Sequence, residues 1–177
     1  SDIGTVSAIL SSMLLISIIS CVGLPMAMTL YLPVNTQNAN RIINSCFIVG
    51  ITVSMTFSLI FILGINIWAP KLEPILGNYK LMIAFIIATM MTTVSLFMGS
   101  MFTAGKRSSF HMIKENIFSI TKILLLILLS GFGIIGIFMS WSIGLMIAIL
   151  AGFFLLFKLW RYKPMLTFDP IIKNMAR

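Results

Sequence analysis

The longest apolar stretch of this sequence lies between Lys122 and Lys158, where 35 residues pass without a charged side chain. A bilayer core about 30 Å thick is crossed by a helix of about 20 apolar residues, so the stretch is too long for one crossing and long enough for parts of two. Gly131, Gly133 and Gly136 lie inside it, and glycine ends a helix at little cost because it tolerates positive φ. The pattern predicts a membrane hairpin that turns at these glycines.

The same pattern continues along the rest of the chain and predicts an all-α integral membrane protein. Clusters of proline, glycine and asparagine separate the apolar runs. We predict five transmembrane helices, over residues 5–32, 44–69, 81–104, 111–130 and 134–160. Composition agrees, because 59% of the residues are hydrophobic and 9% are charged, whereas soluble domains carry about 25% charged residues.

Basic residues are distributed unevenly between the two sides that these spans define. With Lys122 inside the fourth span, two basic residues, Lys71 and Lys80, fall on one side and nine on the other. The nine are Arg41, Lys106, Arg107, Lys114, Lys158, Arg161, Lys163, Lys173 and Arg177. Because cytoplasmic loops are enriched in Lys and Arg, the nine-residue side is predicted to be cytoplasmic and residue 1 extracytoplasmic. The net charge of +8 is explained in this way, and nucleic-acid binding is not expected.

Further helices are expected to accompany these five. An N-terminus outside the membrane needs something that exports it, and the simplest solution is one helix before residue 1. Residues 161–177 contain Pro164 and Pro170 and no closing element. We therefore expect this segment to be a cytoplasmic linker toward a second helical bundle.

Small residues recur at every fourth position of the fifth span, a spacing that lets membrane helices approach closely. They are Gly136, Ser140, Gly144, Ala148 and Gly152. We predict that this small-residue stripe contacts neighbouring helices. The alternative is that Gly and Ala are simply common in membrane helices.

The fourth span carries a polar stripe on its N-terminal half. The stripe consists of Ser108, His111, Glu115, Ser119 and Lys122, at intervals of three and four residues. On a membrane helix such a stripe faces protein or water rather than lipid. His111 taken alone is interpreted as an interfacial residue rather than a proton relay.

Catalytic and metal-binding patterns are missing from the sequence. It contains no Gly-rich phosphate loop, no HExxH and no Cys/His metal spacing. Cys21 and Cys46 lie in apolar runs and are predicted to be packing residues. The single histidine, His111, has no Asp near it of the kind that a serine hydrolase needs. We therefore expect neither an enzyme nor a cofactor or metal.

Several short motifs occur in an order that resembles a known class of transporter. GLPMA at 23–27 ends a long span and leads through YLP at 31–33 to a polar loop. AGKR at 104–107 precedes the half-polar helix, and GxGxxG at 131–136 opens the helix that ends in KP at 163–164. This order resembles the first half of polysaccharide flippases of the O-antigen and teichuronic-acid type. These belong to the superfamily that includes the MATE drug exporters and the lipid II flippases.

The resemblance covers nearly the whole chain, from the family's second helix to its sixth. It implies most of one six-helix bundle in a two-bundle transporter that moves an undecaprenyl- or dolichyl-linked oligosaccharide across a prokaryotic cytoplasmic membrane by alternating access. The implied partners are this lipid-linked oligosaccharide, membrane lipids, and glycosyltransferases or a polymerase of the same pathway. A cation facing a low-dielectric cavity would attract the phosphate of the cargo. The substrate-binding candidates on this basis are Lys122, Arg41, Arg107, Ser119 and Glu115.

Alternatives remain open for the role of Lys122 and for the function of the protein. Lys122 could instead extend toward the cytoplasm along Ser119 and pair with Glu115. A MATE-like cation-coupled exporter would need an embedded carboxylate, and four of the five predicted spans contain no Asp or Glu. A third possibility is a membrane sensor or anchor region that transports nothing.

Overall fold

The computed structural model describes residues 2–34, 39–69 and 79–160. Within these ranges the chain forms seven α-helices and no strand, which confirms the all-α class. The helices are α1 (Asp2–Cys21), α2 (Leu24–Tyr31), α3 (Ala39–Leu63), α4 (Ile65–Trp68), α6 (Tyr79–Ala104), α7 (Ser108–Leu129) and α8 (Gly133–Trp160). A short 3-10 turn, Ser130–Phe132, joins α7 to α8. The predicted linker over 161–177 lies outside the described residues.

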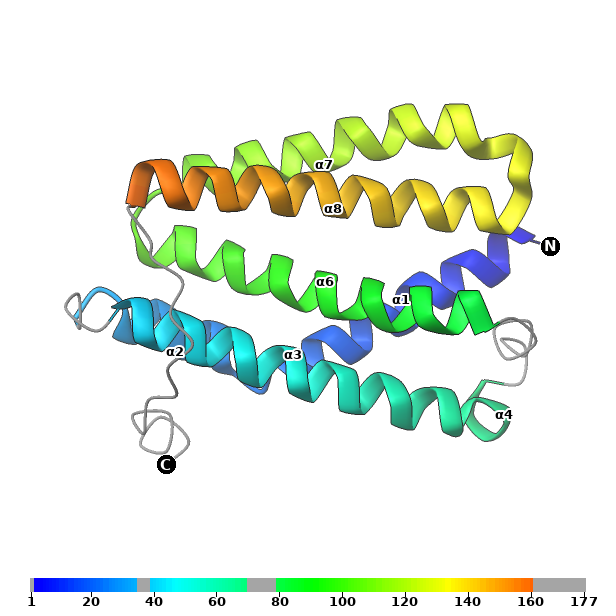
Figure 1. Ribbon diagram of the computed structural model, residues 1–177, viewed down its shortest axis with the longest axis horizontal. Coiled ribbons are helices and arrows are strands. Elements are labelled where there is room, and N and C mark those ends of the chain that lie inside the picture. Colours follow the sequence, from blue (N-terminus) through cyan, green and yellow to red (C-terminus); the bar gives the residue numbers. More distant parts are fainter. Residues whose placement is uncertain (1, 35–38, 70–78, 161–177) are drawn as a thin grey trace.

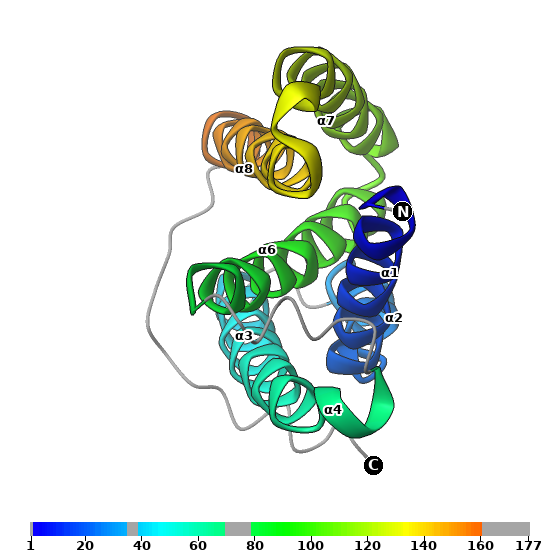
Figure 2. The same cartoon turned by 90° about the vertical axis from the view of Figure 1, so that its right-hand side faces the viewer.

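α6 is the central helix of the arrangement. It contacts α1, α2 and α3 on one side and α7 and α8 on the other (Figure 2). α7 and α8 form an antiparallel hairpin, and α8 runs beside α6 in the same direction (Figure 1). The hairpin turns at the predicted glycines, where Gly133 has a φ of 61°. A Cβ at Gly136 would overlap the Leu129 carbonyl oxygen, so glycine permits the tight return of the chain.

The two ends of the helices differ in the basic residues that the described chain places there. At one end α6 finishes and α7 and α3 begin, which brings Arg41, Lys106 and Arg107 to that end. We call it the Arg107 end. α6 begins at the opposite end, beside the α7–α8 turn, with Lys80 in its first turn. We call this the Lys80 end.

Four helical segments are long and apolar enough to cross a membrane, which makes this a multi-pass chain by length and hydropathy. They are Gly4–Cys21, Ala39–Leu63, Tyr79–Ala104 and Ile135–Phe157. These correspond to the first, second, third and fifth predicted spans. α7 has 22 residues but carries three charged ones, Lys114, Glu115 and Lys122, so the fifth crossing remains a prediction.

The structure corrects the first predicted span, 5–32, from one helix to two. α1 ends at Cys21 and α2 begins at Leu24, with φ angles of 44° at Val22 and 73° at Gly23 between them. In a continuous helix the ring of Pro25 would clash with the carbonyl of Cys21, four residues earlier. The turn instead leaves Pro25 in the first turn of α2, where its missing N–H is no loss. The second predicted span, 44–69, is likewise divided, because α3 ends at Leu63 and α4 follows Gly64.

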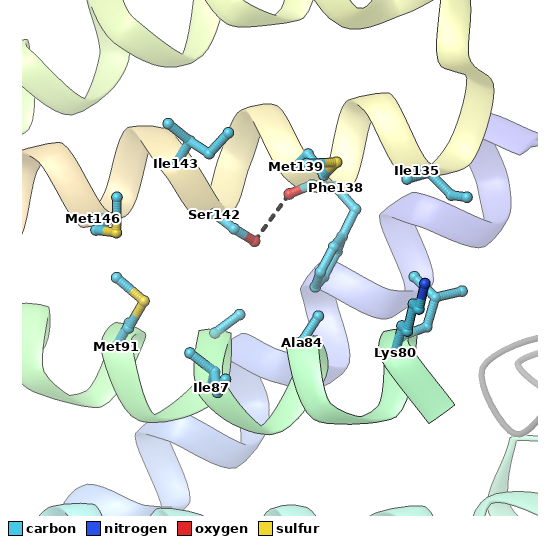
Figure 3. Close-up of a pocket in the computed structure, with 12 residues that line it drawn as sticks. Lys80, Ala84, Ile87, Met91, Ile135, Phe138, Met139, Ser142, Ile143 and Met146 are labelled. Carbon is cyan, nitrogen blue, oxygen red and sulfur yellow. Dashed lines mark hydrogen bonds between the residues drawn. The ribbon is translucent and has the colours of Figure 1, made fainter. Parts of the chain in front are cut away.

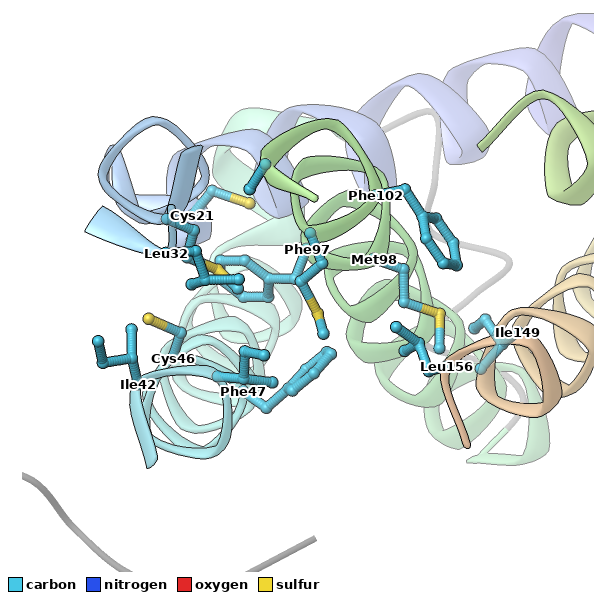
Figure 4. Packing of buried hydrophobic residues seen from close by; sticks show 14 of the residues in the cluster. Cys21, Leu32, Ile42, Cys46, Phe47, Phe97, Met98, Phe102, Ile149 and Leu156 are labelled. Atoms are coloured by element: carbon cyan, nitrogen blue, oxygen red, sulfur yellow. The ribbon is translucent and has the colours of Figure 1, made fainter. Parts of the chain in front are cut away.

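Two buried apolar clusters hold the helices together. The larger one joins the end of α1 to α2, α3, α6 and α8 toward the Arg107 end (Figure 4). Its central ring, Phe97, meets Phe47 edge-to-face at 5.9 Å and leaves no room for a Cβ at Gly50. The two cysteines, Cys21 and Cys46, are buried in this cluster as free thiols. The smaller cluster joins α1, α3, α4, α6 and α8 toward the Lys80 end, around Phe85 and Phe138.

Candidate functional site

Among the described residues, α7 has one buried side chain, and it is the charged side chain of Lys114. Its side chain is 1% exposed, although lysine is almost never fully buried unless it is paired. The Nζ atom donates hydrogen bonds to the carbonyl oxygen of Ser95 at 3.0 Å and to its Oγ at 2.7 Å. It also lies 2.9 Å from Oε1 of Glu115. The three N–H groups of the ammonium therefore have three acceptors.

Glycines on two helices leave space for the side chains of Lys114 and His111. A Cβ at Gly152 of α8 would lie 3.0 Å from the Sδ of Met98 and 3.5 Å from the Cδ of Lys114. A Cβ at Gly99 of α6 would lie 2.9 Å from Cε1 of His111. The aliphatic part of the Lys114 side chain thus lies at the junction of α6, α7 and α8. Larger side chains in place of these glycines would fill the space.

Glu115 lies between the buried lysine and a histidine. Nδ1 of His111 is 3.9 Å from Oε1 of Glu115, and the two side chains are 41% and 47% exposed. Nδ1 is itself covered and makes no hydrogen bond within the described residues. A buried ammonium is tolerated only when an opposite charge and hydrogen bonds compensate its lost hydration, and Glu115 and Ser95 provide both. We call Lys114, Glu115, Ser95 and His111 the polar centre.

The Lys122 side chain contacts an aromatic ring and not Glu115, the partner considered above as an alternative to substrate binding. Its Nζ is 5.2 Å from the centroid of the Phe118 ring, a cation–π contact one turn closer to the Arg107 end. Phe118 in turn meets Trp141 of α8 edge-to-face at 5.8 Å. No ion pair joins Lys122 to Glu115 in the part of the chain that the structure describes.

The remaining substrate-binding candidates are not gathered into one site. Ser119 is exposed on α7, as is Ser108 at its start. Arg107 is exposed and lies over the Phe110 ring, 5.5 Å from its centroid. Arg41 is exposed in the first turn of α3. Arg107 and Lys122 are separated by fifteen residues, roughly 22 Å along a helix, so the guanidinium groups belong to the Arg107 end and not to the level of Lys122.

All five members of the small-residue stripe of α8 are buried. A Cβ at Gly144 would lie 3.3 Å from the backbone nitrogen of Lys122, and Gly152 borders the polar centre. Ser140 donates a hydrogen bond to the carbonyl of Ile137 within its own helix. Ala148 is fully buried.

Sequence reasoning missed Lys114, which it counted as a charge at the membrane boundary. A signal was available in the spacing Phe110, Lys114, Phe118, since residues four apart share one helix face. Phe110 packs on Phe102 of α6 and Phe118 on Trp141 of α8. The lysine therefore lies on the face of α7 that packs inward, while His111, Glu115 and Ser119 lie on more exposed faces.

Two apolar cavities lie along α6. One, of about 490 Å³, lies between α6 and α8, and the other, of about 480 Å³, between α3, α6 and α8. They share Ile87 and Met91 as lining residues. Among the described residues, no group of three His, Cys, Asp or Glu side chains could hold a metal ion.

The helix lengths, the apolar exterior and the four candidate spans define a multi-pass integral membrane protein. The chain has no significant match among protein-family models, curated proteins or solved structures.

Proposed function

We propose that the protein moves a polyprenyl phosphate- or pyrophosphate-linked oligosaccharide across the cytoplasmic membrane of a prokaryote, for synthesis of a surface polysaccharide. The buried ammonium of Lys114 is the observation that carries the proposal. A charge inside a membrane helix is costly and is typical of a path for anions, protons or ions. The motif order that resembles polysaccharide flippases favours a phosphate-linked saccharide among these ligands.

The polar centre supports a simple exchange of anions. In the structure the Lys114 ammonium is paired with Glu115. A phosphate oxygen of the cargo would take the place of the carboxylate, because an ammonium forms charge-assisted hydrogen bonds with either. The carboxylate would remain beside His111, whose Nδ1 lies 3.9 Å from Oε1 of Glu115 in the structure. Ser95 would keep its two hydrogen bonds to the lysine throughout.

The other cations have supporting roles in this proposal. Arg41 and Arg107, exposed at the Arg107 end, would attract the anionic cargo toward the bundle. Lys122 and Ser119 lie further along α7 and would meet the cargo after the polar centre. The proposal assigns the Arg107 end to the cytoplasm and the start of α1 to the outside, with glycosyltransferases or a polymerase of the pathway as partners.

The interruption between α1 and α2 favours a transporter over a passive anchor. Transporters commonly use discontinuous helices, whose free backbone groups line the translocation path. Val22 and Gly23 interrupt the first predicted span, with both residues at positive φ.

A cation-coupled exporter is the second candidate, because Glu115 supplies the membrane carboxylate that such coupling requires. Its proximity to Lys114, at 2.9 Å, makes it less available to a proton or sodium ion than an isolated carboxylate would be. Increased drug sensitivity of a deletion strain with unchanged surface polysaccharide would favour this candidate.

Deletion of the gene in its own host tests the main proposal. We expect loss of one surface polysaccharide, accumulation of its lipid-linked precursor on the cytoplasmic leaflet, and recovery of both when the gene is restored. Unchanged polysaccharide and precursor in the deletion strain would overturn the proposal.

A further inference from the structure

A layer of buried hydroxyl groups separates the two apolar clusters. Each helix that contributes buried residues to both clusters, namely α1, α3, α6 and α8, carries at least one buried serine or threonine between them. On α6, Thr89, Thr92 and Thr93 lie between Ala88 of the smaller cluster and Phe97 of the larger one. We call these residues the hydroxyl layer, and its members are Ser17, Ser20, Ser54, Ser58, Thr89, Thr92, Thr93 and Ser140.

The hydroxyl layer is a weak level of the bundle for two reasons. Its side chains are short, so they interlock less than the large rings of the clusters do, such as Phe47 and Phe97. Its hydroxyls all donate to backbone carbonyls, and all except that of Ser17 donate within their own helix. A hydroxyl bonded in this way competes with the N–H groups of the helix and commonly bends it.

The carbonyl oxygen of Thr89 has more donors than it can accept. Ser17 of α1 donates to it from Oγ at 3.1 Å, and Thr93 of α6 donates to it from Oγ1 at 3.0 Å. In an α-helix the backbone N–H of Thr93 is directed at the same oxygen. A carbonyl oxygen has two lone pairs, so three donors share two positions. The helical hydrogen bond between Thr93 and Thr89 is therefore weakened.

We propose that α6 bends at Thr89–Thr93 and that the bundle moves there as two parts, one around each apolar cluster. The part toward the Arg107 end includes the polar centre, because Ser95 and Gly99 follow the bend on α6. The two cavities along α6 meet at the same level. Both are lined by Ile87 and Met91, and Met91 points toward α8 in the first of them (Figure 3). A bend at this level changes the widths of both cavities.

The bend goes beyond the proposed transport function and does not depend on it. It follows from the donors around one carbonyl and from the packing on either side, which are properties of the folded chain. A transporter would use such a bend to change the access to its cavities, but the bend can be measured in purified protein that transports nothing.

Hydrogen–deuterium exchange of the purified protein in detergent tests the weakened hydrogen bond. Removing a hydroxyl should here strengthen the helix, because two donors then share two lone pairs. We expect Thr93→Val to raise the protection factor of the amide of residue 93 about fivefold, which corresponds to about 1 kcal/mol for one hydrogen bond. Ser17→Ala, which removes the donor from α1, should raise it in the same direction. Thr92→Val is the matched control, since Thr92 is buried in the same layer but donates to the Ala88 carbonyl, at 2.8 Å.

Distances between two spin labels test the movement itself. Val34 and Tyr79 are 80% and 67% exposed and lie toward the Arg107 and Lys80 ends (Figure 1). With cysteines for labelling at these two positions, and Cys21 and Cys46 replaced, we expect a broad distribution of distances. Adding Thr93→Val should narrow the distribution, and adding Thr92→Val should leave it broad.

Two results would overturn the bend. A protection factor in Thr93→Val no higher than in the parent protein, or no higher than in Thr92→Val, would mean that the crowded Thr89 carbonyl does not weaken the helix. A single narrow distance in the parent protein would show that the two parts of the bundle do not move relative to each other.

Discussion

Lys114 of α7 donates hydrogen bonds to both oxygens of Ser95 on α6, at 3.0 Å to the carbonyl and 2.7 Å to the hydroxyl. The carbonyl is available even though Ser95 lies inside a helix, because a carbonyl oxygen has two lone pairs. The contact fixes the α7–α8 hairpin to the central helix by a polar interaction, in a protein whose other contacts between helices are largely apolar.

We expect Ser95→Ala to destabilise the protein. The Lys114 ammonium would lose one of three acceptors in a buried position, which costs about 1.5–3 kcal/mol for a hydrogen bond to a charged group. Ser100→Ala is the control, since Ser100 is also partly buried on α6 but donates only to Leu96 of its own helix. Unfolding in detergent should show a clear loss for the first variant and little change for the second. Equal stabilities would mean that the hydroxyl contributes nothing.

Export should depend more on Lys114 than on Lys122. Lys114→Met removes the cation of the polar centre, and we expect it to abolish surface-polysaccharide export in a complemented deletion strain. Lys122→Met should reduce export less, because its ammonium already lies over the Phe118 ring outside the buried junction. Lys122→Arg should retain more export than Lys122→Met.

Protein abundance, measured by immunoblot, separates loss of function from misfolding in these variants. Removing an embedded charge should not impair membrane insertion. Should Lys114→Met be scarce, the double variant Lys114→Met/Glu115→Gln removes both charges of the pair and should restore abundance without export. Full export from either Lys114 variant would leave the lysine a purely structural residue.

The lengths of the apolar runs were sufficient to predict the all-α class and the four candidate spans. The boundaries predicted for α6 and α8, 81–104 and 134–160, differ from Tyr79–Ala104 and Gly133–Trp160 by at most two residues. The hydropathy pattern did not predict the turn at Val22–Gly23, because the side chains remain apolar through it. The backbone is interrupted there by Gly23 and Pro25, which a hydropathy profile does not register.

The polar centre was only partly predictable for a different reason. The stripe of His111 and Glu115 follows from helical spacing within one segment. The burial of Lys114 depends on Ser95, nineteen residues earlier, and on Gly152 of α8. The spacing of Phe110, Lys114 and Phe118 indicates the face of α7 that packs inward, but it does not identify the partners on α6 and α8.

Overpacking of the small-residue stripe should destabilise the hairpin. Ala148 is fully buried, and Gly144 faces the backbone of Lys122, which cannot rotate away as a side chain could. We expect Ala148→Leu and Gly144→Leu each to cost about 1–3 kcal/mol. Ala8→Leu, at an exposed position of α1, is the control and should be neutral. Identical melting temperatures for the three variants would contradict close packing by α8.

Gly23→Ala tests the interruption between α1 and α2. Gly23 has a φ of 73°, and no atom lies within 4 Å of the place where its Cβ would be, so any cost is conformational. Left-handed backbone costs a residue with a Cβ about 1–2 kcal/mol. Gly131→Ala has the same open surroundings without the left-handed φ and should cost less. A stability of Gly23→Ala no lower than that of Gly131→Ala would show that the turn is not held at this angle.

The orientation of the helices can be tested by labelling single cysteines in a background without Cys21 and Cys46. Ser108 and Tyr79 are both exposed, at the start of α7 and at the start of α6, and therefore at the Arg107 and Lys80 ends. Because basic residues favour the cytoplasmic side, we expect Ser108→Cys to react with a membrane-impermeant reagent only after the cells are opened. Tyr79→Cys should react in intact cells. The reverse result would invert the topology, and with it the direction in which the Arg107 end could receive a cargo. Reaction of both cysteines from outside would place α6 on one side of the membrane and contradict its assignment as a span.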